Sequence, residues 1–358
     1  MRSKQALVIA SGVFSAATVL IWAQAPAAAP QTGPGIQSAA DAKEPEVLAT
    51  CKNPAPARGP AAAGRGRAGA APPSTAMREY TVTEIPGVIA AGQKWKEVWK
   101  VDGNNADGII ATKDGGILIA QNSNSDVIKL DKNGKTSVAY SGTNTGGALA
   151  MNTRGVLFVN NRGLNSDIVE LAPKKKVFAN KYQGDAFDCV RSVLNDLTAD
   201  SKGGVYFTMG GLFYADPKGV VTKYGENLQT NGIILSPDEK TLYVTNGGAV
   251  AAFDVQPDGS LTNQRVFAKL EAGGSGDGST VDSAGRLYVT SGPGVQVFAA
   301  DGKYLGLIPT PQNVISTAFS GPDKKTLYAV VSIRDGAKLS AQIITIPMIA
   351  QGFKGRAK

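Results

Sequence analysis

From residue 77 onward, short apolar runs alternate with turns rich in Gly, Asp and Asn. Runs of this kind predict β-strands, and the residues between them predict tight turns. No amphipathic stretch of about 10–15 residues separates the strands, so the helices of an α/β fold are missing from the pattern. The pattern therefore predicts an all-β fold.

The strand pattern repeats six times, and each copy pairs two apolar runs across a turn. The paired runs are 106–110 with 116–120, 147–150 with 156–160, 195–198 with 205–208, 231–234 with 242–245, 277–280 with 287–290, and 316–319 with 327–330. A recurrence of about 40 residues matches one four-stranded propeller blade. We therefore expect a six-bladed β-propeller of four-stranded antiparallel blades over residues 77–352. Strands from residues 80–83 and 343–346 would close the ring and hide its sheet edges.

The N-terminal region has the features of an export signal. Arg2 and Lys4 precede an apolar run over residues 6–22, and a small-x-small site follows at 23–25. This order predicts a signal peptide over residues 1–25. An uncleaved membrane anchor is the alternative, although the run is slightly short of the roughly 20 residues that span a bilayer. We expect an exported protein, periplasmic or extracellular, with no stable membrane span after cleavage.

The next segment is dominated by Ala, Pro and Gly, and such a composition buries too little apolar surface to fold. It predicts a disordered linker over residues 26–76, and a basic tail over residues 353–358 follows the propeller. Export would place the two cysteines, Cys51 and Cys189, in an oxidising compartment where they can pair. A bridge would tether the linker to the propeller, and the sequence leaves this pairing open.

Composition excludes several classes of chemistry. The chain has no histidine, so no imidazole is present for a Ser-His-Asp or Cys-His arrangement or for a His-ligated zinc site. Its net charge is +8 without a dense basic stripe interleaved with aromatics, which argues against a nucleic-acid partner. Any metal would have to be held by oxygen ligands.

The polar residue that opens each repeat would lie at one end of an innermost strand, facing the channel axis. These residues are Asp107, Gly147, Asn195, Asn231, Asp277 and Ser316. Carboxylates and carboxamides meeting at one height form an oxygen set that suits a hard divalent cation, Ca²⁺ first, with Zn²⁺, Mg²⁺ or Mn²⁺ as alternatives. The competing interpretation is local, because Asp and Asn also favour turns through their own backbone hydrogen bonds.

The repeats resemble the SMP-30/gluconolactonase/luciferin-regenerating-enzyme-like family. The resemblance covers roughly residues 105–335, and its strongest motifs are 231–245, 277–289, 321–328, and 195–197 with 205–208. It implies a six-bladed propeller with one metal at the axial mouth and a small-molecule substrate.

The resemblance also implies roles for individual residues. Asn231 and Asp277 match metal ligands of the family, and Asn195 matches a substrate-binding neighbour of the metal. Asp107 stands where the family has a Glu ligand, so its side chain is one methylene shorter, and the Pro and Trp that usually follow are missing. Arg191 resembles a basic residue that contacts substrate.

Two functional hypotheses follow. In the first, the protein is a metal-dependent hydrolase of a sugar lactone or related ester, in which Asp277 takes the proton from a metal-activated water. In the second, the same propeller binds a metal, a sugar acid or a protein partner without chemistry. A fold alone does not decide between them, because propellers host many functions.

Overall fold

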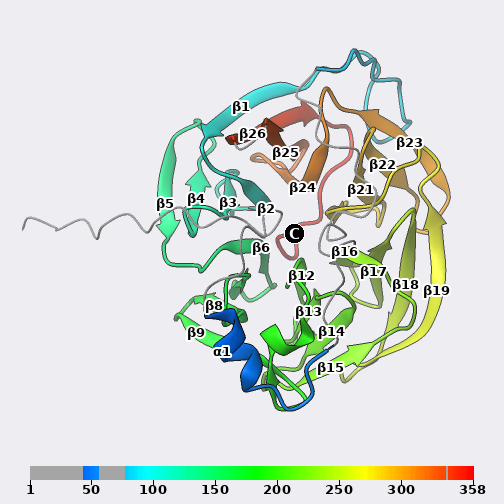
Figure 1. The fold of residues 1–358 in the computed structure, drawn as a ribbon. Coiled ribbons are helices and arrows are strands. Elements are labelled where there is room, and N and C mark those ends of the chain that lie inside the picture. The colour runs from blue at the N-terminus through cyan, green and yellow to red at the C-terminus, as the bar shows by residue number, and fades with distance from the viewer. Residues whose placement is uncertain (1–42, 56–76, 336–337) are drawn as a thin grey trace, which may run out of the picture.

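Six four-stranded antiparallel sheets form a ring around a central axis (Figure 1). The computed structural model describes residues 43–55, 77–335 and 338–358. Blades follow one another in chain order, and in the first five the strands pair consecutively from the axis outward. The predicted all-β, six-bladed propeller is confirmed.

The strands are as follows. Blades one to three are β2 (Ala106–Ala111), β3 (Ile117–Gln121), β4 (Asp126–Leu130), β5 (Thr136–Tyr140); β6 (Gly146–Met151), β7 (Leu157–Asn161), β8 (Asp167–Ala172), β9 (Lys176–Ala179); β12 (Leu197–Ala199), β13 (Val205–Thr208), β14 (Leu212–Ala215), β15 (Val221–Tyr224). Blades four to six are β16 (Thr230–Leu235), β17 (Thr241–Asn246), β18 (Ala249–Val255), β19 (Leu261–Lys269); β20 (Ser279–Val281), β21 (Leu287–Ser291), β22 (Gly294–Phe298), β23 (Tyr304–Pro309); β24 (Val314–Ser320), β25 (Thr326–Asp335), β26 (Lys338–Pro347), β1 (Lys96–Asp102). The remaining elements are α1 (Glu44–Ala49), η2 (Phe187–Val190), and the short pair β10 (Lys181–Tyr182) and β11 (Asp185–Ala186).

Burial of each strand follows its distance from the axis. β3, β7 and β13 are buried at every position, because neighbouring blades cover both of their faces. β5, at the rim, is exposed over most of its length. Apolar side chains therefore pack between blades, as where Ile110 and Leu118 of blade one join Leu149 and Val159 of blade two. Burying one such side chain contributes about 1.5–3 kcal/mol, so the core of the protein lies between the blades.

The strand that closes the ring differs from the expected one. β1 supplies the outermost strand of blade six, with Trp99 opposite Ile343 of β26. The expectation that residues 80–83 form this strand was wrong, although the partner over 343–346 was right. Val82 and Ile85 instead bury their side chains in the cluster that joins blades five and six.

Residues 352–358 lie inside the ring, at the end of the channel where the inner strands finish (Figure 1). Ala357 forms a β-bridge with Met151, the last residue of β6. The Arg356 guanidinium is almost fully buried and donates a hydrogen bond to the carbonyl of Leu235, the last residue of β16. This burial lowers the pKa of Arg356 to about 10. The basic tail predicted over 353–358 thus fills one end of the channel.

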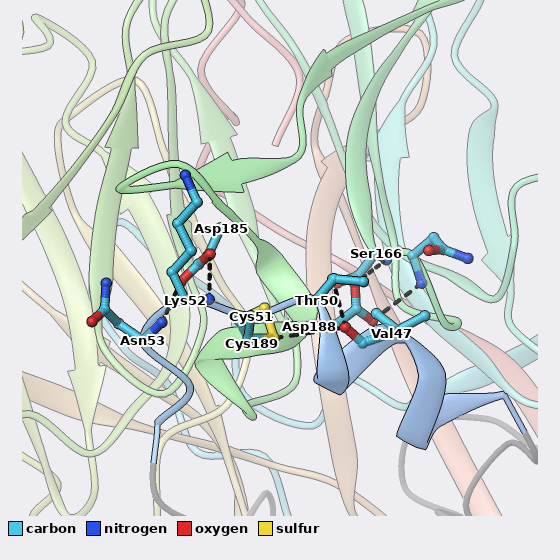
Figure 2. Close-up of a disulfide and its surroundings, with 10 residues drawn as sticks. Val47, Thr50, Cys51, Lys52, Asn53, Ser166, Asp185, Asp188 and Cys189 are labelled. Carbon is cyan, nitrogen blue, oxygen red and sulfur yellow. Dashed lines mark hydrogen bonds between the residues drawn. A yellow bond between two sulfur atoms is a disulfide. The ribbon is translucent and has the colours of Figure 1, made fainter.

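A disulfide joins Cys51 to Cys189, 138 residues apart in the sequence (Figure 2). The Asp185 carboxylate accepts hydrogen bonds from the backbone N–H groups of Lys52 and Asn53, each at 2.9 Å. These two bonds lower the pKa of Asp185, since they favour its charged form. The segment after α1 is therefore attached to blade three's entry loop both covalently and by hydrogen bonds.

Part of the predicted linker over residues 26–76 is thus structured, because residues 43–55 include α1 and the bonded cysteine. The rest of that linker and the predicted signal peptide over 1–25 lie outside the described residues. Within the parts of the chain that the structure describes, no helix has the length and apolar character needed to span a bilayer.

Reducing the disulfide should lower stability, because a bridge across a long loop restricts the unfolded chain. We expect the Cys51→Ala/Cys189→Ala variant to lose about 2–4 kcal/mol of unfolding free energy, measured by chemical denaturation. Limited proteolysis should then cleave near residues 43–55 in this variant and not in the oxidised wild type. Identical denaturation curves for the two proteins would contradict this account of the segment.

Candidate functional site

The inner strands open with a shared irregularity at one end of the channel. In β2, β6 and β16 the pairing with the second strand shifts directly after the first residue pair. Two inner-strand residues then face one partner residue, and a bulge of this kind re-aims a side chain. The residue after the first pair is Asp107, Gly147 or Asn231, and each is therefore offset from the regular ladder at the same height in its blade.

One pocket lies at this end of the channel. It is lined by Asp107, Gly108, Arg162, Asn195, Asp196, Asn231, Asp277, Gly278, Ile315 and Ser316. Five of the six axial positions identified in the sequence therefore meet, and the sixth, Gly147, has no side chain. The predicted ligands Asp107, Asn231 and Asp277 line the same pocket, while their chemical roles remain predictions.

Side chains at the ends of the second strands hold the axial backbone of the next blade. Asn160 at the end of β7 donates from Nδ2 to the carbonyl of Asn195 at 2.5 Å, and Thr208 of β13 donates from Oγ1 to the carbonyl of Asn231 at 2.6 Å. Thr290 of β21 likewise reaches the carbonyl of Ile315 at 3.2 Å. Each donor is buried, so these bonds fix the height of the axial residues between blades.

Neighbouring inner strands approach each other so closely that glycine is required between them. A Cβ added at Gly232 would lie 2.1 Å from the carbonyl oxygen of Asp277. Asn195 also donates from Nδ2 to Oδ1 of Asn231 at 2.5 Å, which links the third and fourth blades at the pocket itself. The pocket wall is thus held by direct contact between blades.

Arg162 follows β7 and reaches into this pocket. Its side chain is only 3% exposed and forms an ion pair with Asp107. Nε donates to the carbonyl of Leu194 at 2.9 Å, and Nη2 donates to both the carbonyl and the Oδ1 of Asn195. A fork of donors on one rigid plane suits guanidinium, because lysine offers a single charged head. Arg162 therefore fastens blade two to blades one and three at the axis.

Gly147 provides the space that the guanidinium fills. A Cβ at this position would lie 1.9 Å from Cζ of Arg162 and 2.0 Å from its Nε. Blade two therefore presents a cation from the residue after its second strand, where each of the other five blades presents a polar side chain at or just before the start of its inner strand.

Asp196 lines the pocket and connects it with the filled end of the channel. One carboxylate oxygen accepts from the backbone N–H of Ile233 at 2.9 Å, and the other forms an ion pair with Lys358. Lys358 also donates to the carbonyl of Ile233 at 3.2 Å, and both ionised side chains are largely buried. The channel is thus closed below the pocket by a buried ion pair.

The oxygen donors of the pocket do not fit a divalent metal in this arrangement. Asp107 is already paired with the Arg162 cation, and Oδ1 of Asn231 accepts a hydrogen bond from Asn195. Two unit charges about 4 Å apart interact by about 4 kcal/mol at an effective dielectric constant near 20, so a divalent ion beside a guanidinium is repelled about twice as strongly.

Two arginines differ from what the sequence predicted for the pocket. Arg191, predicted to bind substrate, follows η2 and is not among the residues that line the pocket. Arg162 was missed, although the sequence carries a signal for it. Gly147 breaks the run of polar axial residues in the same repeat that ends in Asn160, Asn161 and Arg162.

The architecture defines a class of protein: a six-bladed propeller with a polar pocket at one end of its axis. Residues 136–333 match the family model described as SMP-30/Gluconolactonase/LRE-like region. The chain belongs to this family, as its repeats indicated.

Curated relatives and solved structures extend the comparison. The gluconolactonase of Zymomonas mobilis is 29% identical over 190 residues, covering 44% of this chain and 52% of the relative. The pentonolactonase XacC of Haloferax volcanii is 34% identical over 157 residues, covering 40% and 54%. The chain therefore spans about half the length of the curated relatives it matches.

Among solved structures, a gluconolactonase from Xanthomonas campestris superposes with a TM-score of 0.63 at 22% identity, covering 78% of this chain and 98% of that chain. A regucalcin from Agrobacterium tumefaciens, described as a calcium-binding protein, superposes with a TM-score of 0.57 at 18% identity, covering 73% and 98%. Both comparisons support the propeller fold.

The ion pair beneath the pocket should contribute measurably to stability. Lys358→Met leaves the Asp196 carboxylate without its cation, and we expect a loss of about 2 kcal/mol of unfolding free energy, since hydrogen bonds to charged groups contribute about 1.5–3 kcal/mol. Lys354→Met is the matched control, because Lys354 lies in the same tail and is exposed. Equal effects of the two substitutions in denaturant titrations would show that the buried pair is not stabilising.

Proposed function

We propose that the protein is a lactone hydrolase that opens a sugar lactone or a related ester at the axial pocket. The observation that carries the proposal is the convergence of Asn195, Asn231 and Asp277 on one pocket. Family membership supports it, and so does the similarity to relatives named gluconolactonase and pentonolactonase. The substrate would be a small polyhydroxylated molecule, since amide and carboxylate groups dominate the pocket wall.

Asp277 is the proposed catalytic base. In this mechanism Asp277 takes a proton from a water molecule, and the water oxygen attacks the lactone carbonyl carbon. The bond between that carbon and the ring oxygen then breaks, the ring oxygen receives a proton, and the product is a hydroxy acid. Asn195 and Asn231 are proposed to orient the ring through its hydroxyl groups.

The resemblance to the family implies a metal-assisted version of this reaction, with Asp107, Asn231 and Asp277 as ligands of a divalent ion. The ion pair of Asp107 with Arg162 argues against that version here. The proposal therefore assigns the proton transfer to Asp277 itself and places no step on a metal. Arg191 has no part in it, because Arg191 does not line the pocket.

Binding without turnover is the second candidate function. The observation that favours it is the same pairing of Asp107, which removes one predicted ligand of a catalytic metal. A sugar acid, the product of the proposed hydrolysis, would then be the natural ligand. Calorimetry with aldonic acids, carried out beside the turnover assay, separates the two functions.

We also propose that the protein works outside the cytoplasm. The disulfide between Cys51 and Cys189 supports this, since such bonds persist mainly in oxidising compartments. The charged and apolar pattern at residues 1–25 points the same way.

The hydrolase proposal is tested with a panel of hexono- and pentonolactones, followed by acid release and corrected for spontaneous opening. Asp277→Asn should lower kcat/KM by at least about 100-fold, the usual contribution of a general base. Asp301→Asn is the control, because Asp301 is an exposed turn residue of the same blade. Absence of turnover on the whole panel by folded wild-type protein would overturn the proposal.

A further inference from the structure

We infer that Arg162 is the resident cation of the axial pocket and takes the place of a divalent metal, so that this protein keeps its pocket metal-free. The inference concerns the same pocket as the proposed hydrolase and rests on the contacts of Arg162. The experiment that tests the inference measures metal binding, which is independent of turnover.

Burial of the guanidinium is the first support. The Arg162 side chain is only 3% exposed, so its charge and its N–H groups must have partners, because an unpaired buried charge is strongly disfavoured. Asp107 supplies the opposite charge, and Leu194 and Asn195 accept hydrogen bonds from the remaining nitrogens. The side chain is thus fixed in the pocket by partners from two neighbouring blades.

The space for the guanidinium is the second support. Alanine at position 147 would already overlap Cζ of Arg162, so the backbone of blade two is shaped to admit this group. Asn160 strengthens the arrangement, since its Oδ1 accepts from the backbone N–H of Gly147 at 3.1 Å. Gly147 and Arg162 therefore act as one unit, in which the long side chain that follows β7 fills the space left by the glycine in β6.

Charge balance is the third support. Three carboxylates line this end of the channel, on Asp107, Asp196 and Asp277. Arg162 neutralises the first and Lys358 neutralises the second. A hard divalent cation needs several anionic oxygens at once, and here the carboxylates of Asp107 and Asp196 are already matched by cations of the chain itself.

The consequence concerns the ligand. A metal-free pocket lined by one fixed guanidinium, two carboxamides and the carboxylates of Asp107, Asp196 and Asp277 favours a neutral polyhydroxylated ligand that hydrogen-bonds to those groups. In a hydrolase, Arg162 acts as a positioning residue, because it holds Asn195 and supplies a permanent positive field near the reacting carbonyl.

The decisive experiment is a calcium titration of the full oxidised chain, followed by calorimetry and by the unfolding temperature. Wild-type protein should show no binding heat and no rise in Tm up to about 10 mM CaCl₂, a concentration that saturates even weak extracellular calcium sites. The same absence is expected with Mg²⁺, Mn²⁺ and Zn²⁺. A stoichiometric calcium ion in wild-type protein, removable with EDTA, would overturn the inference.

Substitutions test whether the charge of Arg162 is responsible. Arg162→Ala uncovers the oxygens of Asp107 and Asn195, and it should gain a calcium-dependent rise in Tm of about 3 °C or more. Adding Asp107→Glu, which extends the carboxylate toward the axis, should increase that rise. Arg162→Lys keeps the charge and should remain insensitive to calcium, and Arg154→Ala is the control at an exposed position of the same blade.

Each outcome is informative. A folded Arg162→Ala variant without any calcium response shows that Arg162 does not occupy a metal position, which overturns the inference. If that variant does not fold, the wild-type titration still decides. A metal-free wild type without lactonase activity would overturn the proposed function and support the inference. A wild type that is active and binds calcium would support the proposed function and overturn the inference.

Discussion

The contact between neighbouring blades at the channel axis is the constraint on which the site depends. Inner strands approach so closely that glycine is needed at positions such as 232, and buried Asn160 and Thr208 tie the axial backbone of blades three and four to the blade before. Six inner strands from distant parts of the sequence therefore begin at one height. Without these ties, the polar residues of the pocket would be six unrelated turn residues.

The periodicity of the chain was sufficient to predict the ring and the axial residues, because a blade repeats its own hydrophobic pattern. Arg162 was not predicted, since its role depends on tertiary contacts: its guanidinium fills the space left by Gly147 and pairs with groups of the two neighbouring blades. The closing strand was misplaced for a similar reason. Residues 80–83 and 96–102 are both β-prone, and only the packing of Val82 and Ile85 on blades five and six separates them.

The two ends of the channel differ in what occupies them. At one end, polar side chains line a small pocket, and at the other end residues 352–358 fill the space between the strands. Asp196 lies between the two, bonded to the backbone of blade four on one side and to Lys358 on the other. This buried pair closes the channel on one side of the pocket, so the proposed ligand would have to enter from the other side.

The central claim is that a guanidinium, and not a metal ion, occupies the axis of this propeller. The most direct measurement is a crystal structure of the oxidised chain from crystals held in about 10 mM CaCl₂, with anomalous data collected for calcium. The account predicts guanidinium density between Asp107 and Asn195 and no anomalous peak in the pocket. A calcium peak bound by Asp107, Asn231 and Asp277, with Arg162 turned away, would contradict it.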